Sequence, residues 1–262
     1  LMPATGKQTA HALNIRYGGT SALLQSDQNI RLGSGYFRKL LDRYNGSPVL
    51  AAAAYNAGPH RVSRWLPTDQ SLQAELWMEL IPYPETRSYV RRVLAYRLPV
   101  DALAPLIHDP DREVRITVAD RIPVDQLEQL VNDEDYLVRQ YVARRLKPGR
   151  LFRMINDSDR EVRKTVALRL PLESLQLMMH DASPEVRLVV AERIDLESIE
   201  RMSNDLDWRV RVAVCQRVAF DRLADFLEDD DEDVRAFARA STGMTSERRA
   251  SMFASQALEV RS

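Results

Sequence analysis

A 24-residue unit recurs through most of this chain and constrains its fold more than any other feature. The first copy begins at Asp109 and reads D-P-D-R-E-V-R-I-T-V-A-D-R-I-P-V-D-Q-L-E-Q-L-V-N. A Val-Arg pair returns in six copies without an insertion: Val114-Arg115, Val138-Arg139, Val162-Arg163, Val186-Arg187, Val210-Arg211 and Val234-Arg235. A fixed period of this size is typical of a solenoid, in which each unit buries its apolar face against its neighbours.

Each copy carries the signals for two short helices. One column contains only residues that favour the N-cap of a helix: Asp111, Asp135, Asp159, Ser183, Asp207 and Asp231. The helix that follows has one apolar face, formed in the first copy by Val114, Val118, Ala119 and Ile122. A second short element carries two apolar residues, such as Leu127 and Leu130. One unit cannot hide both apolar faces, so stacking is obligatory.

A column of small residues predicts where neighbouring helices approach closely. It contains Ala119, Ala143, Ala167 and Ala191, and Cys215 takes the same place in a later copy. We therefore expect Cys215, the single cysteine of the chain, to be a small buried residue.

Two charged columns recur as faithfully as the apolar ones. An Asp opens every copy, from Asp109 to Asp229, and an Arg follows each core Val, from Arg115 to Arg235. We expect the two columns to form an Asp–Arg ladder along the solenoid, with the arginine stems lying on the apolar face. A ligand-binding stripe is the alternative interpretation of the same pattern.

The pattern V-R-x-x-V-A-x-R-[LI]-P resembles the leucine-rich repeat variant family over about residues 99–240. The resemblance implies alternating α- and 3-10 helices wound into a right-handed solenoid. A family member carries an N-terminal cysteine cluster that holds an iron–sulfur centre; this chain has no such cluster, so we expect no cofactor. We assign residues 99–242 to the solenoid and residues 243–262 to a C-terminal capping helix, which we expect over Thr245–Leu258.

Residues 1–98 are predicted to be helices joined by short polar loops, so the whole chain is expected to be all-α. The helices are expected from about residue 4, from Asp27 to Tyr44, and over residues 49–55, 60–66, 72–80 and 86–97. The second is assigned an apolar stripe of Ile30, Gly33, Phe37, Leu40, Leu41 and Tyr44. This part has 12 Lys and Arg against 6 Asp and Glu. A basic surface suits an anionic polymer, although unequal surface solvation explains it as well.

The last helix of this first part is in phase with the repeats. Val90-Arg91 lies 24 residues before Val114-Arg115, and Arg97-Leu98-Pro99 lies 24 before Arg121-Ile122-Pro123. We therefore expect the helix over residues 86–97 to act as the first helix of the array, without a flexible linker.

Four motifs occur in order in residues 1–98: Leu1-Met2-Pro3-Ala4-Thr5, then Asn29-Ile30-x-x-Gly33-x-x-Tyr36, then Ala54-Tyr55-Asn56-Ala57-Gly58-Pro59, and finally Glu85-Thr86-Arg87 followed by Tyr89. In this order and spacing they resemble the catalytic domain of soluble lytic transglycosylases. The resemblance implies a partial goose-type lysozyme-like fold. It also implies that peptidoglycan is the substrate, cleaved between MurNAc and GlcNAc without water to leave a 1,6-anhydro product.

The family's single catalytic Glu lies upstream of the motif that begins here at Leu1. We therefore expect no catalytic residue within this chain and no cleavage by it. The resemblance implies that the substrate is bound by Met2, Tyr55, Asn56, Glu85 and Tyr89. Simpler interpretations remain open, because Met2 and Tyr89 also suit a core and Asn56-Ala57-Gly58-Pro59 is also a good helix C-terminus.

Other site types find little support in the sequence. Glu75 and Glu79 are expected on a solvated helix face, and His60, His108 and His180 lack metal-ligand spacing. Arg61 and Arg64 lack the aromatic interleaving of a nucleic-acid site, and no apolar run is long enough to span a membrane.

Two functions follow as expectations. The first is binding of peptidoglycan glycan strands, in the periplasm or cell envelope, or in the cytoplasm if the protein has no signal peptide. The alternative is a non-enzymatic scaffold that binds a protein partner on the solenoid surface.

Overall fold

The computed structural model describes residues 2–66 and 74–242, and within these ranges it is helical and contains no strand. The prediction of an all-α chain is therefore confirmed. Contacts divide the chain into two compact units, residues 1–122 and 123–262. The expected capping helix over residues 243–262 lies outside the described residues.

The first unit begins with helices whose starts are set by proline. Proline stands in the first turn of α1 (Pro3–Ala12), α3 (Pro48–Ala57), α4 (Pro59–Trp65) and α6 (Pro84–Arg97), where its missing N–H costs no hydrogen bond. The remaining elements are η1 (Thr20–Leu24), α2 (Ser26–Arg43), α5 (Ala74–Glu79), η2 (Val100–Ala102), η3 (Ala104–Leu106) and α7 (Arg112–Arg121).

The core of this unit is built on the alanine-rich helix α3. Ala51 to Ala54 are fully buried, and their small side chains let α2 and α6 pack closely on α3. The larger side chains around them come from several helices: Leu40, Val49, Val62, Trp77, Met78, Ile81, Val90 and Leu94.

The predicted apolar stripe of α2 is partly wrong. Ile30 is 66% exposed, whereas Leu32 is buried with Ala10 and Leu23 in a second, smaller cluster. The helix therefore turns Leu32 and Gly33 inward at its N-terminal end, where η1 and α1 pack against it. Element η1 was not predicted, because its five residues are too few to show a helical period.

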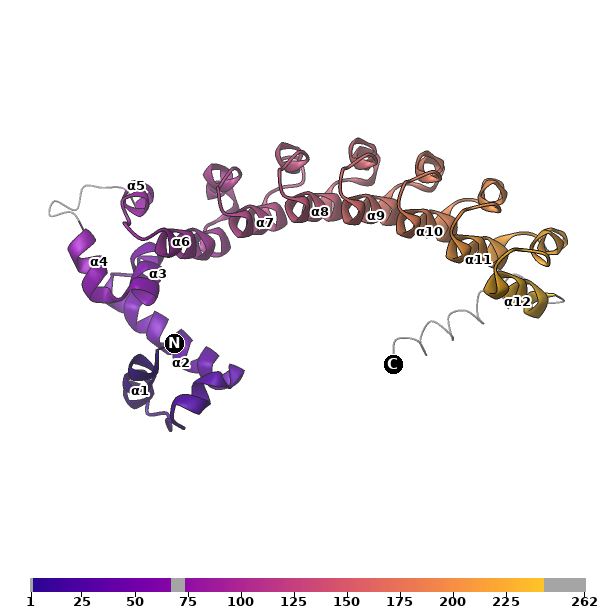
Figure 1. The fold of residues 1–262 in the computed structure, drawn as a ribbon. Helices are drawn as coiled ribbons and strands as arrows, with labels where there is room; N and C mark the ends of the chain where they lie inside the picture. Colours follow the sequence, from indigo (N-terminus) through magenta and orange to yellow (C-terminus); the bar gives the residue numbers. More distant parts are fainter. Residues whose placement is uncertain (1, 67–73, 243–262) are drawn as a thin grey trace. The chain divides into compact units, whose positions relative to one another are not determined.

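The second unit alternates α- and 3-10 helices, as predicted. Its α-helices are α8 (Tyr136–Arg145), α9 (Arg160–Arg169), α10 (Pro184–Arg193), α11 (Trp208–Arg217) and α12 (Glu232–Ser241). Its 3-10 helices are η4 (Leu127–Leu130), η5 (Pro148–Met154), η6 (Leu172–Met178), η7 (Ile199–Met202) and η8 (Phe220–Phe226). Within this unit the α-helices lie side by side in one row and the 3-10 segments form a second row (Figure 1).

The aspartate column caps the repeat helices as predicted, with one exception. In five copies the carboxylate accepts a hydrogen bond from the backbone N–H two residues later: Asp111, Asp135, Asp159, Asp207 and Asp231. At Ser183 the side chain makes no such bond, because its hydroxyl donates instead to a Glu185 carboxylate oxygen at 2.7 Å.

The Asp–Arg ladder is confirmed. Arg163 donates from Nε and Nη2 to both carboxylate oxygens of Asp181, at 2.8 and 3.0 Å. Its Nη1 donates to the backbone carbonyl of Asp157 at 2.8 Å. The same two-pronged pair recurs as Arg139–Asp157, Arg187–Asp205 and Arg211–Asp229. The pairs are nearly buried, so each arginine links the turn before its own helix to the turn before the next.

A second arginine column ties neighbouring helices together, and the sequence analysis did not anticipate it. Arg193, at the end of α10, donates to the carbonyls of Ala167 and Leu170 at the end of α9. Arg217 repeats these bonds on Ala191 and Ile194. These guanidinium groups satisfy carbonyls that a helix C-terminus leaves without partners.

The same contacts occur within the first unit, between α6 and α7. Arg121 donates to the carbonyls of Ala95 and Leu98, just as Arg193 does to those of Ala167 and Leu170. Arg91 approaches Asp109 with Nε 3.6 Å from Oδ2, which is the ladder pair in a looser form. Helix α6 therefore packs as the first helix of a repeat, as its phase predicts.

We predict that Ala167→Leu destabilises the second unit. Ala167 is fully buried, and a larger side chain would force α9 and α10 apart, at a cost of about 1–3 kcal/mol. The shift in urea midpoint measures the effect. Leu168→Ala is the control, because Leu168 is 52% exposed and should tolerate truncation. Equal midpoints for Ala167→Leu and the wild type would show that this column is not at the seam between repeats.

We also predict opposite pH behaviour for two ladder aspartates. The hydrogen bond from Arg211 lowers the pKa of Asp229 below its usual 3.8, whereas burial raises the pKa of Asp109 above it. The lowered pKa means that ionised Asp229 stabilises the fold at pH values above 3.8, and that this contribution is lost as acid protonates it in the fold. The raised pKa means that ionised Asp109 costs stability near neutral pH, a cost that protonation relieves.

Asp229→Asn should therefore cost about 2–3 kcal/mol at pH 7 and reduce the loss of stability in acid. Asp109→Asn retains the oxygen that accepts from the Asp111 N–H, and should be nearly neutral or stabilising at pH 7. Urea midpoints between pH 7 and pH 3 measure both. Equal losses for the two variants would contradict the assignment.

Candidate functional site

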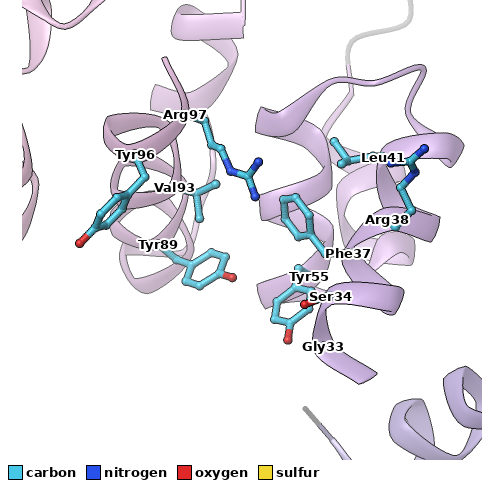
Figure 2. Close-up of a pocket in the computed structure, with 10 residues that line it drawn as sticks. All are labelled: Gly33, Ser34, Phe37, Arg38, Leu41, Tyr55, Tyr89, Val93, Tyr96 and Arg97. Atoms are coloured by element: carbon cyan, nitrogen blue, oxygen red, sulfur yellow. The ribbon is translucent and has the colours of Figure 1, made fainter. Parts of the chain in front are cut away.

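A groove of the first unit lies between α2, α3 and α6. It has a volume of about 470 Å³. Its walls are shown in Figure 2 and comprise Gly33, Ser34, Phe37, Arg38, Leu41, Tyr55, Tyr89, Val93, Tyr96 and Arg97. Helices α2 and α6 supply most of these side chains, and Tyr55 comes from the buried helix α3 between them.

Tyr55 is the centre of an aromatic cluster in this groove. Its ring stacks on Tyr89, with centroids 6.1 Å apart and planes 6° from parallel. Tyr36 and Phe37 of α2 lie 5.7 and 5.9 Å from the same ring. Such offset aromatic pairs are favourable and hold the rings in fixed orientations. The groove therefore offers preorganised flat apolar surfaces with hydroxyl groups at their edges.

Burial keeps these hydroxyl groups protonated. It is the main cause that raises the pKa of Tyr36, Tyr55 and Tyr89 above the usual value of 10.0. At neutral pH the three side chains can donate and accept hydrogen bonds, and they do not act as bases. Their chemistry suits the binding of a polar ring compound.

Gly33 allows α2 to approach Tyr55. A Cβ atom at Gly33 would lie 2.9 Å from the Tyr55 hydroxyl oxygen, which is closer than real contacts allow. The backbone of Gly33 is helical, so space rather than conformation requires glycine here.

The structure brings two of the five predicted binding residues together in the groove, Tyr55 and Tyr89. Asn56 lies at the end of α3, where its side-chain oxygen accepts from the Thr86 hydroxyl at 2.7 Å. Glu85 is exposed in the first turn of α6, next to that bond. Met2 precedes α1 and is 74% exposed, so the interpretation of Met2 as a core residue is wrong.

Several groove residues were missed by the sequence analysis, among them Arg38, Val93, Tyr96 and Arg97. Tyr96 and Arg97 stand on a helix whose core face had been assigned to the repeat array. Only the packing of both α2 and α6 on α3 shows that another face of α6 lines a groove. The repeat phase of Arg97 could have indicated that this residue is important, because arginine at the same position of later repeats has a defined structural role.

No aspartate or glutamate is among the described residues that line the groove. Glu79 instead pairs with Arg91, and Asp42 lies 3.6 Å from Arg38 on the outer side of α2. The side chain of Glu75 is outside the described part of the structure. The described lining of the groove therefore offers no carboxylic acid to protonate a leaving group.

Metal and membrane sites are also absent from what the structure describes. No group of three or more His, Cys, Asp or Glu side chains is arranged there to hold a metal ion. Within the same residues, no helix is both long and apolar enough to cross a membrane.

Comparisons with known proteins match two parts of the chain to different families. Residues 1–78 match the transglycosylase SLT domain, and residues 112–135 and 160–183 match the leucine-rich repeat variant. A solved structure of a leucine-rich repeat variant with a novel repetitive motif is 42% identical, with a TM-score of 0.60. The match covers 79% of this chain and 86% of that one. The chain belongs to the leucine-rich repeat variant family.

Its first part is in addition similar to transglycosylases. The soluble lytic murein transglycosylases of Salmonella typhimurium and Escherichia coli K12 are 39% and 37% identical to it over 98 residues. This stretch is 37% of the present chain and spans only 15% of the length of those relatives. A leucine-rich repeat variant that begins with a transglycosylase-like domain therefore accounts for both units, as predicted.

We predict that Gly33→Ala disturbs the aromatic cluster. The added methyl group must displace the Tyr55 hydroxyl, which should cost about 1–3 kcal/mol and change the near-ultraviolet circular dichroism of the tyrosines. Gly149→Ala is a matched control, because a Cβ there meets no atom within 4 Å. If both variants match the wild type in urea midpoint and spectrum, Gly33 is not required for this packing.

Proposed function

We propose that this leucine-rich repeat variant binds peptidoglycan glycan strands in the groove between α2, α3 and α6. The observation that carries the proposal is the aromatic cluster of Tyr55 and Tyr89 within a domain that matches the transglycosylase SLT family. The flat faces of sugar rings pack on aromatic rings, and the hydroxyl groups at the ring edges complement those of a sugar. The excess of Lys and Arg over Asp and Glu in residues 1–98 suits an anionic polymer.

In this proposal Met2, Asn56 and Glu85 extend the binding surface beyond the groove. Asn56 lies at the end of α3 and Glu85 at the start of α6. The hydrogen bond from Thr86 holds the side chain of Asn56 in place. Glu85 remains exposed and offers a carboxylate to sugar hydroxyl groups. A ligand of this kind places the protein in the periplasm or cell envelope.

We further propose that the chain as given does not cleave the strand. Non-hydrolytic cleavage requires one acid that protonates the glycosidic oxygen and then, as a base, helps the sugar's own hydroxyl to attack. The described groove contains no carboxylate, and tyrosines whose pKa values are raised above 10.0 are poor proton donors at neutral pH.

Co-sedimentation with purified peptidoglycan sacculi tests the binding. The wild type should sediment with the sacculi, and Tyr96→Ala should weaken binding roughly fivefold through loss of about 1 kcal/mol of contact. Tyr96 lines the groove but is 70% exposed, so its truncation should leave the fold intact. Tyr136→Ala, in the second unit, is the control and should bind as the wild type does. Absence of wild-type binding would refute the proposal.

Chromatography of the same incubations tests the absence of cleavage. No 1,6-anhydromuropeptides should appear in the supernatant, even after long incubation with an excess of protein. Their release by the pure chain would mean that a residue within it acts as the acid.

A second candidate, a protein-interaction scaffold, is favoured by one feature of the second unit. Leu172, Leu196 and Phe220 stand at the same position of successive repeats and are 52%, 63% and 52% exposed. Each is followed directly by an exposed acidic residue: Glu173, Glu197 and Asp221. We propose that this stripe binds a protein segment that carries apolar and basic side chains, because the acidic row complements basic residues and repels an anionic membrane.

Selection of displayed random peptides on the whole chain tests the scaffold. Selected peptides should combine Leu or Phe with Lys or Arg, and should lose binding to Leu196→Ser. Leu206→Ser is the control, since Leu206 is 96% exposed at a different position of the repeat. Peptides that bind all three proteins equally would show that the stripe is not the binding surface.

A further inference from the structure

An arginine ends each of the helices α7 to α11, and in four of them its bonds show a defined structural task. Arg193 and Arg217 each donate to two carbonyls at the end of the preceding helix, and Arg169 donates to one. In the first unit Arg121 does the same on α6. These residues are part-buried, and their charge is directed at backbone oxygens of the neighbouring helix.

Arg97 occupies the same repeat position in α6, 24 residues before Arg121. However, α6 is the first helix of the array, so it has no preceding repeat helix whose carbonyls Arg97 could reach. Within the described residues Arg97 makes no hydrogen bond or ion pair, and its side chain is exposed. The position has thus kept its arginine while losing the partner that explains it in the other repeats.

The guanidinium group of Arg97 is turned toward the groove. Figure 2 shows it extending from the end of α6 past Val93 toward Phe37, above the stacked rings of Tyr55 and Tyr89. The other lining arginine, Arg38, lies near Asp42 on α2. Since no described carboxylate lines the groove, Arg97 supplies a positive charge there without an opposite one.

We propose that Arg97 recognises a carboxylate of the ligand bound in this groove. The inference rests on the proposed function and narrows it to an acidic glycan. In peptidoglycan, alternate sugars carry a lactyl arm that ends in a carboxylate or continues into a peptide with carboxylates. With a sugar ring on the tyrosines, such an arm is within the range of the planar guanidinium fork, which binds carboxylates through two parallel hydrogen bonds.

Arg97 should therefore make the groove bind acidic glycans more tightly than neutral ones. A neutral chitin oligosaccharide can use the aromatic surface but not Arg97, whereas a muramic-acid glycan can use both. Loss of one charge-assisted contact typically weakens binding about tenfold. Arg97→Gln should therefore weaken the acidic ligand by about this factor and leave the neutral one unchanged.

Titration of the full chain with two probes tests this. The first is a GlcNAc–MurNAc tetrasaccharide with its lactyl carboxylates free, and the second is a chitin tetrasaccharide of the same length. The proteins compared are the wild type, Arg97→Gln, Arg97→Lys and Arg38→Gln. We expect selective loss of the acidic probe with Arg97→Gln, partial recovery with Arg97→Lys and a smaller effect with Arg38→Gln, because Arg38 already has Asp42 nearby. Raised salt should weaken the acidic probe more than the neutral one.

The possible failures are distinguishable. If the wild type binds neither probe, the proposed function itself is refuted, and this inference with it. If the wild type binds both probes but Arg97→Gln weakens both equally or neither, glycan binding stands and the role of Arg97 is refuted. Circular dichroism of Arg97→Gln should match the wild type, since Arg97 is exposed at a helix end; if the variant is unfolded, Arg97 is structural and the inference is wrong.

Discussion

A nearly buried guanidinium–carboxylate pair sets the geometry of the repeats. Four aspartates of the column, Asp157, Asp181, Asp205 and Asp229, are each held from two sides. In Asp157, for example, Oδ1 accepts from the N–H of the helix-capping residue and both oxygens accept from an arginine of the preceding repeat. The arginine in turn donates to the carbonyl of the aspartate before its own helix. The pair therefore fixes the distance between two successive turns. Its arginine and its aspartate are 18 residues apart in the sequence.

This pairing explains why the repeats have a constant length of 24 residues. Desolvation makes buried ion pairs weak sources of net stability, but removal of one partner leaves a buried charge uncompensated. An added residue between Arg139 and Asp157 would displace both groups from a contact of 2.8 Å. A constant repeat length thus follows from a polar network that must be satisfied completely.

The sequence predicted the repeat unit well because its signals are local and repeated. The cap column, the ladder and the buried alanines were all predicted from spacing. Only Ser183 departed from its column, because its hydroxyl donates to the Glu185 carboxylate instead of capping the helix. The arginines at the helix ends were not interpreted, because their partners are backbone carbonyls, which no residue type reveals. In the first unit the analysis placed Ile30 in the core, where the packing of η1 instead buries Leu32. The groove depends on which faces of α2 and α6 are left uncovered when both helices pack on α3. A helix that occurs once has no repeated pattern in the sequence from which that face could be predicted.

Within the first unit, helix α6 belongs both to the globular core and to the repeat array, because different faces of the helix make the two sets of contacts. Val90 and Leu94 are buried in the alanine-based core, as a helix of a globular domain requires. Arg91 reaches toward Asp109, and the carbonyls of Ala95 and Leu98 receive Arg121, as a repeat helix requires. Tyr89, Val93, Tyr96 and Arg97 remain on a third face, where no repeat helix covers them and the groove forms. The start of an array always leaves one helix face without a repeat partner; here a different domain occupies part of that face, and what it leaves uncovered is the groove.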